Sequence, residues 1–307
     1  MLTAYLSHPA CLRHDMGAEH PESPARLRAI DDRLHAAHLF DFLLHRDAPS
    51  VTRQQLLRVH DAAYVDAIEA AAPVQGLVAL DPDTAMNPHT LDAARHAAGG
   101  AVHAVEMVMQ GEVANAFVAC RPPGHHATRN RAMGFCLFNN VAVAAAHALD
   151  GFGLERVAIV DFDVHHGNGT EDIFRDDGRV MLCSTFQHPY YPFSGADGAS
   201  DHIVPVPLPA GTAGPAYREA FEARILPQLD AFRPQFVFCS AGFDGHREDD
   251  MAQFGLVEAD YAWITESVME VAARHAGGRI VSVLEGGYDL SALGRSVATH
   301  IKTLAGL

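Results

Sequence analysis

Residues 157–169 read VAIVDFDVHHGNG, in which four apolar residues lead directly into acids, imidazoles and glycines. A short apolar run without polar alternation is typical of a parallel strand that is covered on both faces. Because residues two apart in an extended chain share a face, we expect Asp161, Asp163 and His165 to project to one side. Carboxylates held this close repel each other unless a cation lies between them. The stretch therefore predicts a buried strand that ends in half of a divalent-metal site, with a solvated strand end as the alternative.

Similar apolar runs recur along the chain and alternate with amphipathic helical patterns. The expected strands are residues 2–6, 116–119, 157–161, 180–184, 235–240 and 279–284, and the expected helices are residues 24–37, 90–109, 139–149, 216–229, 258–275 and 291–304. Apolar strands that alternate with helices predict one doubly wound α/β domain over residues 1–307, with a mostly parallel sheet. The glycine- and proline-rich residues 190–214 are expected to form a long loop that contains one short strand.

The composition excludes several classes of function. With 307 residues, of which 49% are hydrophobic, the chain can bury a full core, which excludes intrinsic disorder. The 22 basic and 38 acidic residues leave a net charge of −16, which argues against nucleic acid as a partner and favours a cationic one. Lys302 is the single lysine, so Schiff-base chemistry and a phosphate-binding P-loop have no suitable residue.

The cysteines and the first residues of the chain bear on its location. The five cysteines form no C-x-x-C pair, which predicts neither a disulfide framework nor a zinc site made of cysteines alone. The first 15 residues lack the basic region and apolar stretch of a signal peptide, and no run approaches the roughly 18 apolar residues of a spanning helix. We therefore expect a cytoplasmic protein with no membrane partner.

In a doubly wound sheet, ligands bind beyond the carboxyl ends of the strands, so the segments that follow the strands should carry the chemistry. RPPGHHA at 121–127 follows one expected strand. Its prolines and glycine fix a turn that can direct His125 and His126 into one cavity. Taken alone, two adjacent histidines are more often a surface pair.

Two further strand ends carry polar side chains. SAGFD at 240–244 places Asp244 where a third carboxylate can complete an Asp/His/Asp metal set. LEGGYDL at 284–290 follows the last expected strand, and its glycines leave the Tyr288 hydroxyl free to reach a ligand. Each signal is modest, but all of them fall at the carboxyl ends of strands, which predicts a single site.

These segments, together with HPESPARL at 20–27 and GFCLFNN at 134–140, resemble the histone deacetylase family of the arginase/deacetylase superfamily. They occur in the order of that family over nearly the whole chain, and Asn168 is typical of its class II branch, which includes bacterial members. The resemblance implies a single three-layer α/β/α domain around a mostly parallel sheet of eight strands. The pattern of apolar runs locates six of these strands.

The resemblance also implies the roles of the site residues. It makes Asp163, His165 and Asp244 the ligands of Zn2+, although a set so rich in oxygen also suits Fe2+. The catalytic residues would be His126 as general base and acid, His125 beside it, Asp161 and Asn168 as the partners of His125 and His126, and Tyr288 as donor to the substrate carbonyl.

The same resemblance implies a tunnel for the acyl chain and a structural ion. Phe135 and Tyr191 would form the tunnel walls, the Gly134 carbonyl would accept the amide N–H, and Met251 would lie at the rim. K+ would be held by Asp161, Asp163, His165, Ser184 and Thr185, several of them through main-chain carbonyls.

Two departures from the family pattern fall at the expected tunnel mouth. Phe193 stands where relatives usually carry glycine, and residues 246–251 read HREDDM in place of the usual Gly-Asp-Pro-Leu loop. We expect a deacetylase that acts on acyl-lysine. A small acetylated polyamine is the first alternative, which an acid at position 251 would favour and Met251 does not, and a catalytically silent acyl-lysine binding module is the second. The pattern indicates no oligomeric state.

Overall fold

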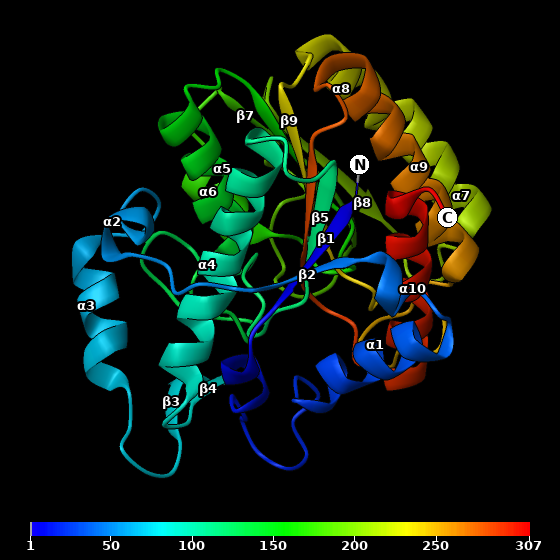
Figure 1. The fold of residues 1–307 in the computed structure, drawn as a ribbon. Helices are drawn as coiled ribbons and strands as arrows, with labels where there is room; N and C mark the ends of the chain where they lie inside the picture. Colours follow the sequence, from blue (N-terminus) through cyan, green and yellow to red (C-terminus); the bar gives the residue numbers. More distant parts are fainter. Residues whose placement is uncertain (1) are drawn as a thin grey trace.

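The computed structural model describes residues 2–307 and confirms the predicted fold class, with three layers in the order α/β/α (Figure 1). The central sheet has eight strands in the order β2-β1-β5-β10-β9-β6-β7-β8, and all of its pairings are parallel. Its strands are β1 (Thr3–Ser7), β2 (Leu44–Asp47), β5 (Asn115–Val118), β6 (Val157–Asp161), β7 (Val180–Gln187), β8 (Ile203–Leu208), β9 (Phe236–Ala241) and β10 (Ile280–Leu284). A separate antiparallel hairpin is formed by β3 (Val78–Asp81) and β4 (Thr84–Met86).

Helices cover both faces of the sheet. One face is covered by α4 and α5, and the other by α9 and α10, against which α1 packs (Figure 1). The helices are α1 (Ala25–Ala36), α2 (Arg53–Leu56), α3 (Ala62–Ala71), α4 (Thr90–Met109), α5 (Asn140–Phe152), α6 (Asn168–Phe174), α7 (Gly214–Arg224), α8 (Leu226–Phe232), α9 (Glu258–His275) and α10 (Leu290–Ala305). No helix within residues 2–307 has both the length and the apolar composition that crossing a bilayer requires.

The central strands are buried on both faces, as their apolar runs indicate. Every residue of β5, β6, β9 and β10 is buried. The register of these strands sets Asp161, the last residue of β6, opposite Ser184 of β7 and Ser240 of β9. Their carboxyl ends are therefore level, and the loops that leave them start from one edge of the sheet.

The prediction of a single helix over residues 216–229 is wrong. The chain forms α7 and α8 there, and the two helices meet at Ile225. Pro227 has no N–H, so it cannot donate to the carbonyl of Ala223 as a continuous helix requires. A new helix therefore begins with the proline in its first turn, where no intrahelical donor is needed.

The two sheet strands that the pattern does not locate lie at the two edges of the sheet. β2 reads Leu-His-Arg-Asp and is partly exposed, so it lacks the apolar run of a buried strand. β8 lies within residues 190–214, where one short strand is expected. An edge strand is covered on fewer sides, and its sequence therefore carries a weaker signal.

A buried ionic cluster joins the first turns of the chain to the sheet. Glu22 is fully buried, and Arg121 donates to both of its carboxylate oxygens, from Nε at 2.5 Å and from Nη2 at 2.6 Å. Arg26 donates to the same carboxylate at 3.1 Å and also to two carbonyls of the loop that follows β10. Burial alone would raise the pKa of Glu22, but Arg121, His14 and Arg26 outweigh it and hold that pKa well below its usual value.

We expect Glu22→Ala to lower the free energy of unfolding by about 3–5 kcal/mol, because two buried guanidinium groups lose their counterion. Asp66→Ala is the control. It breaks a 2.7 Å ion pair with Arg53 in which the side chains are 63% and 42% exposed, and it should cost less than about 1 kcal/mol. Urea unfolding followed by circular dichroism measures both values. Equal losses in the two variants would contradict a stabilising role for the cluster.

Candidate active site

β5, β10, β9 and β6 are neighbours in the sheet, and the loops that follow them carry the predicted catalytic and metal-binding side chains. The loop after β5 carries His125 and His126, the loop after β9 carries Asp244, and the loop after β10 carries Tyr288. These residues are far apart in the sequence. The level ends of four adjacent strands bring them together.

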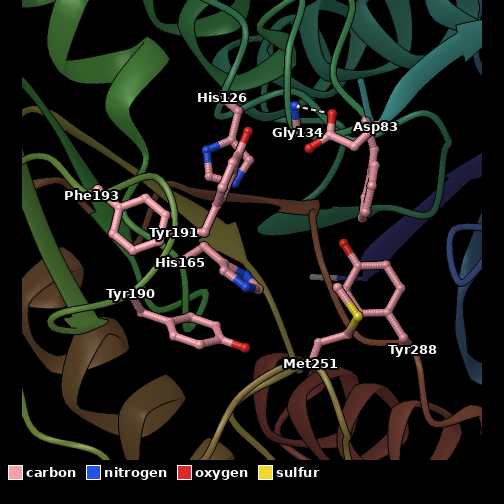
Figure 2. Close-up of a pocket in the computed structure, with 10 residues that line it drawn as sticks. Asp83, His126, Gly134, His165, Tyr190, Tyr191, Phe193, Met251 and Tyr288 are labelled. Carbon is pink, nitrogen blue, oxygen red and sulfur yellow. Dashed lines mark hydrogen bonds between the residues drawn. The ribbon is translucent and has the colours of Figure 1, made fainter. Parts of the chain in front are cut away.

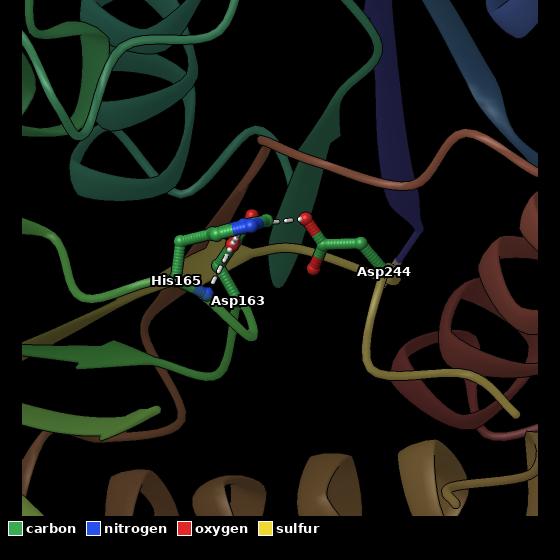
Figure 3. A group of neighbouring side chains, drawn as sticks. All are labelled: Asp163, His165 and Asp244. Carbon is green, nitrogen blue, oxygen red and sulfur yellow. Dashed lines mark hydrogen bonds and ion pairs between the residues drawn. The ribbon is translucent and has the colours of Figure 1, made fainter. Parts of the chain in front are cut away.

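Asp163, His165 and Asp244 form a compact buried triad (Figure 3). Nδ1 of His165 lies 3.1 Å from Oδ1 of Asp163 and 3.1 Å from Oδ2 of Asp244. Main-chain donors hold the two carboxylates, because the N–H of Val164 donates to Asp244 at 3.0 Å and the N–H of Gly286 donates to Asp163 at 2.8 Å. One possible ligand atom from each member of the triad lies within 4.8 Å of the others.

The chemistry of the triad suits a divalent cation. Two carboxylates and an imidazole are ligands that Zn2+ and Fe2+ accept. Burial and the charge of Asp163 raise the pKa of Asp244 to about 6. Burial lowers the pKa of His165, but its bonds to the two carboxylates outweigh that effect and raise the pKa well above its usual value. These surroundings favour positive charge among the three side chains, which a divalent ion would provide.

Two glycines allow the loops to approach the carboxylates closely. A Cβ at Gly242 would lie 2.1 Å from Oδ2 of Asp163, and a Cβ at Gly286 would lie 2.1 Å from Oδ2 of Asp244. Any larger residue at either position would displace a carboxylate. The glycines of the SAGFD and LEGGYDL segments are therefore part of the construction of the triad.

The chain leaves extended geometry immediately after β6. Oδ1 of Asp161 accepts the N–H of Asp163 at 3.1 Å, and Oδ1 of Asp163 accepts the N–H of His165 at 2.9 Å. These local bonds fold residues 161–165 into a tight turn. The expectation that Asp161, Asp163 and His165 share one face of an extended chain is therefore wrong, because the chain turns after β6. Asp161 faces His125 instead of joining the triad.

His125 and His126 lie side by side, with ring centroids 4.0 Å apart, but have different partners. Nδ1 of His125 lies 2.9 Å from a carboxylate oxygen of Asp161, whereas Nδ1 of His126 lies 2.8 Å from the amide oxygen of Asn168. Burial lowers the pKa of His125, but Asp161 and then Asp163 outweigh it and raise that pKa to about 10. Burial and the charge of His125 hold the pKa of His126 well below its usual value. These surroundings favour the protonated form of His125 and the neutral form of His126.

Asn168 also determines which nitrogen of His126 carries the hydrogen. The amide nitrogen of Asn168 is directed towards Sδ of Met133 at 3.4 Å, so its oxygen faces Nδ1 of His126. Because an amide oxygen only accepts, Nδ1 carries the hydrogen and Nε2 keeps a free lone pair. His126 lines the adjoining cavity, where this lone pair can accept a proton.

A cavity of 420 Å³ opens beside the triad and the histidine pair (Figure 2). It is lined by Asp83, His126, Gly134, Phe135, His165, Tyr190, Tyr191, Phe193, Met251 and Tyr288. The four residues expected to bind substrate, Gly134, Phe135, Tyr191 and Met251, therefore all lie in its wall. The rings of Phe135 and Tyr288 pack edge to face, and their centroids lie 5.8 Å apart. Aromatic pairs prefer this arrangement.

Asp83 is a cavity residue that sequence reasoning missed. It lies in the turn between β3 and β4, and its Oδ1 accepts the N–H of Gly134 at 3.1 Å and the hydroxyl of Thr84 at 2.8 Å. The cavity wall therefore contains an acid, although position 251 does not supply one. Nothing in the local sequence marks this residue, because a short aspartate-rich turn is common on protein surfaces.

Asp249 was missed as well, although it lies in the HREDDM loop. Its side chain is buried, with Oδ2 accepting the N–H groups of Tyr288 at 2.6 Å and Asp289 at 2.9 Å. Oδ1 accepts the N–H of Met251 at 3.0 Å. On the other side of Tyr288, the guanidinium carbon of Arg26 lies 4.9 Å from the ring centroid. Asp249 and Arg26 together fix the position of the phenol.

The residues expected to hold potassium are also neighbours. Asp161 at the end of β6 pairs in register with Ser184 of β7, and Oγ1 of Thr185 lies 3.5 Å from the main-chain oxygen of Asp161. Asp163 and His165 follow in the turn after β6. The end of β6, the turn that follows it and the paired residues of β7 thus bring the five residues together, and two of them, Asp163 and His165, also belong to the triad.

A family model described as the histone deacetylase domain matches residues 20–304, which is most of the chain. The chain belongs to the histone deacetylase family. A histone deacetylase-like amidohydrolase of Pseudomonas aeruginosa is 40% identical over 279 residues, which cover 89% of this chain and 73% of that protein. The deacetylase and amidohydrolase activities for which these proteins are named support a hydrolase.

Two further members of the family show its range. The polyamine deacetylase HDAC10 of Mus musculus is 37% identical over 302 residues, which cover 93% of this chain and 45% of that protein. The crystal structure of the HDA15 HD domain superposes with a TM-score of 0.94 at 37% identity and covers 99% of this chain and 88% of that one. This likeness establishes the arginase/deacetylase type of fold. The substrates of the family as a whole include more than one class of acylated amine.

Proposed function

We propose that this chain is a zinc-dependent amidohydrolase that removes acetyl or related acyl groups from the ε-amine of acyl-lysine in proteins or peptides. One observation carries the proposal: a single aromatic cavity is lined by His126, by Tyr288 and by His165, the member of the buried Asp/His/Asp triad that reaches it. These are the groups that hydrolysis of an amide requires, namely a cation site, a base and a donor to the carbonyl oxygen.

Asp163, His165 and Asp244 would hold the zinc ion, and the same oxygen-rich set would also accept Fe2+. When bound, such an ion supplies Lewis-acid chemistry, because it polarises a carbonyl and lowers the pKa of water. We also propose that K+ binds next to it, where its charge would offset the buried carboxylates. Its ligands would be Asp161, Asp163, His165, Ser184 and Thr185.

His126 acts in this proposal as the general base and then as the general acid. Nε2 of neutral His126 takes a proton from the water molecule that attacks the amide carbon, and the resulting imidazolium returns a proton to the leaving amine. Asn168 holds the required tautomer without adding a negative charge. His125, which Asp161 holds beside His126, would add positive charge next to the reacting group.

Tyr288 is the donor to the carbonyl oxygen. Its side chain lines the cavity across from His126 (Figure 2). The hydroxyl would donate to the carbonyl oxygen most strongly as negative charge builds up there, so its effect belongs to the transition state. Asp249 holds the main chain of Tyr288 from one side, and Arg26 lies over its ring.

The cavity walls suit a lysine side chain that carries an acyl group. Phe135 and Tyr191 offer apolar surfaces to the methylene stem, and Met251 adds another at the rim. The carbonyl of Gly134 accepts the thiol of Cys136 at 3.2 Å and has a second lone pair for the substrate amide N–H. Acyl-lysine satisfies these groups with one amide and four methylenes.

An acetylated polyamine is a second candidate substrate, and a specific observation favours it. Asp83 places a carboxylate in the cavity wall, where it can pair with a distal ammonium group. The mouse relative named as a polyamine deacetylase belongs to the same family. A catalytically silent binding module is disfavoured, because the residues proposed as base, donor and cation ligands lie at the cavity or next to it.

We expect Tyr288→Phe to lower kcat about 100- to 1000-fold with little change in KM, because the lost hydroxyl acts on transition-state charge. Steady-state kinetics on an acetyl-lysine peptide measure this, with the metal content of each protein as the control. Wild-type turnover in Tyr288→Phe would mean that the phenol is structural and that the mechanism is wrong.

Asp249→Ala extends this test to the positioning of Tyr288. It should lower kcat about tenfold in the wild-type background and have little further effect in Tyr288→Phe, because residues that act through one group are not additive. Equal losses in both backgrounds would show that Asp249 does not act through Tyr288.

Met251→Glu should raise kcat/KM for acetylspermidine relative to an acetyl-lysine peptide by about tenfold, which corresponds to about 1.4 kcal/mol. An ion pair at a partly desolvated rim is stronger than the 0–1 kcal/mol that is typical of an exposed pair, and salt should reduce the gain. Met251→Gln is the uncharged control. If the wild-type protein already preferred acetylspermidine strongly, Met251 would not determine substrate specificity. Acetylated polyamines would then replace acyl-lysine as the proposed substrate.

A further inference from the structure

Phe193 combines two unfavourable features at the mouth of the active-site cavity. Its side chain is 76% exposed, although phenylalanine gains free energy from burial. Its φ is +60°, in the left-handed region that residues other than glycine rarely adopt. A glycine at this position would relieve the backbone strain and remove the exposed ring. Folding alone therefore does not favour Phe193.

Local contacts hold the main chain of the loop that carries Phe193. The N–H of Phe193 donates to the carbonyl of Tyr190 at 2.7 Å. Gly195 packs so closely on His166 that a Cβ there would lie 2.4 Å from the imidazole ring. The chain is therefore held on both sides of Phe193, and the residue lies in the wall of the active-site cavity.

Phe193 lies where two hollows meet. One is the active-site cavity of 420 Å³, in which Figure 2 shows the Phe193 ring across from Tyr288 and Met251. The other is a groove of 460 Å³, which residues 193–198 form with α6. A substrate whose acyl-amine enters the cavity and whose remaining part lies in the groove has to cross the Phe193 ring.

The groove carries side chains of both charge signs. Glu171, Asp172 and Asp197 contribute carboxylates, and His188 contributes an imidazole. Arg175 contributes a guanidinium group, which pairs with Glu171 at 2.7 Å. A peptide main chain offers both N–H donors and carbonyl acceptors and can satisfy this mixture. The excess of carboxylates in the groove also suits the ammonium groups of a polyamine, so the groove alone accepts either substrate and the Phe193 ring is the group that distinguishes them.

We propose that Phe193 is a specificity-determining residue, which contacts the part of the substrate outside the active-site cavity and favours acyl-lysine within a peptide over a small acylated amine. The inference rests on the proposed function and names its substrate class. The flat apolar ring would pack on the peptide main chain next to the acyl-lysine, a contact that glycine cannot make. This contact accounts for a strained and exposed aromatic residue at this position.

The test compares kcat/KM for a heptapeptide with a central acetyl-lysine and for Nε-acetyl-lysine amide. In Phe193→Gly the ratio of the two values should fall about tenfold, while the melting temperature rises by about 2 °C as backbone strain is relieved. Phe193→Tyr keeps the ring and should keep the wild-type ratio. Arg233→Gly is the matched control, because Arg233 also has a positive φ, of 54°, at the end of α8 and does not line the cavity or the groove. It should change stability alone.

The outcomes separate this inference from the proposed function. An unchanged ratio in Phe193→Gly, in a protein that hydrolyses both substrates, would overturn the role of Phe193 and leave the function standing. Acetylspermidine is assayed as a third substrate, and a larger loss for it than for the heptapeptide in Phe193→Gly would also overturn the role, because the ring would then select polyamines. Absence of hydrolysis of every acyl amide by the wild-type protein with zinc bound would defeat the proposed function itself.

Discussion

Two buried carboxylates, Asp163 and Asp244, lie against one imidazole at the end of a parallel sheet, and the need for positive charge between them governs the site. Buried like charges are costly unless a cation or donor compensates them. The structure supplies main-chain N–H groups from Val164 and Gly286 and glycines that let the loops approach. These contacts orient the carboxylates towards one point, and a divalent ion there would complete the balance of charge.

The compensation of charge continues outwards from the triad. Glu285 accepts the N–H groups of Gly124 at 2.7 Å and His125 at 3.1 Å and so holds the histidine loop against β10. Farther out, Glu22 is held between two arginines, and one of these, Arg26, also donates to the loop that carries Tyr288. The site is therefore built on buried ionic contacts that join distant parts of the chain, and a change in one of them can move a group that touches substrate.

The sequence predicts those features that depend on burial and on strand direction. The apolar runs of β6, β9 and β10 indicate strands covered on both faces, and parallel strands place their following residues at one edge. The convergence of Asp163, His165 and Asp244 follows from that arrangement. The resemblance to the family adds the roles of the individual residues, which spacing alone does not indicate.

What the sequence does not predict depends on contacts between segments without a strong local pattern. The edge strand β2 is too polar and too short to be recognised, and Asp83 lies in a surface turn that only the folded chain brings to Gly134. The turn after β6 arises from side chain–main chain bonds of Asp161 and Asp163, which an extended-chain argument does not contain. Such features depend on contacts that form only in the folded chain.

The central claim is that the buried triad holds a divalent ion that hydrolysis requires. The most direct measurement determines metal content and turnover of an acetyl-lysine peptide in the same samples, before chelation, after chelation and after stepwise return of zinc, for the wild-type protein and Asp244→Asn. We expect turnover to rise in proportion to bound zinc and to reach its maximum at one ion per chain, and we expect Asp244→Asn to bind the ion weakly and to remain inactive. Full turnover in the metal-free wild-type protein, or undiminished zinc binding and turnover in Asp244→Asn, would contradict the central claim.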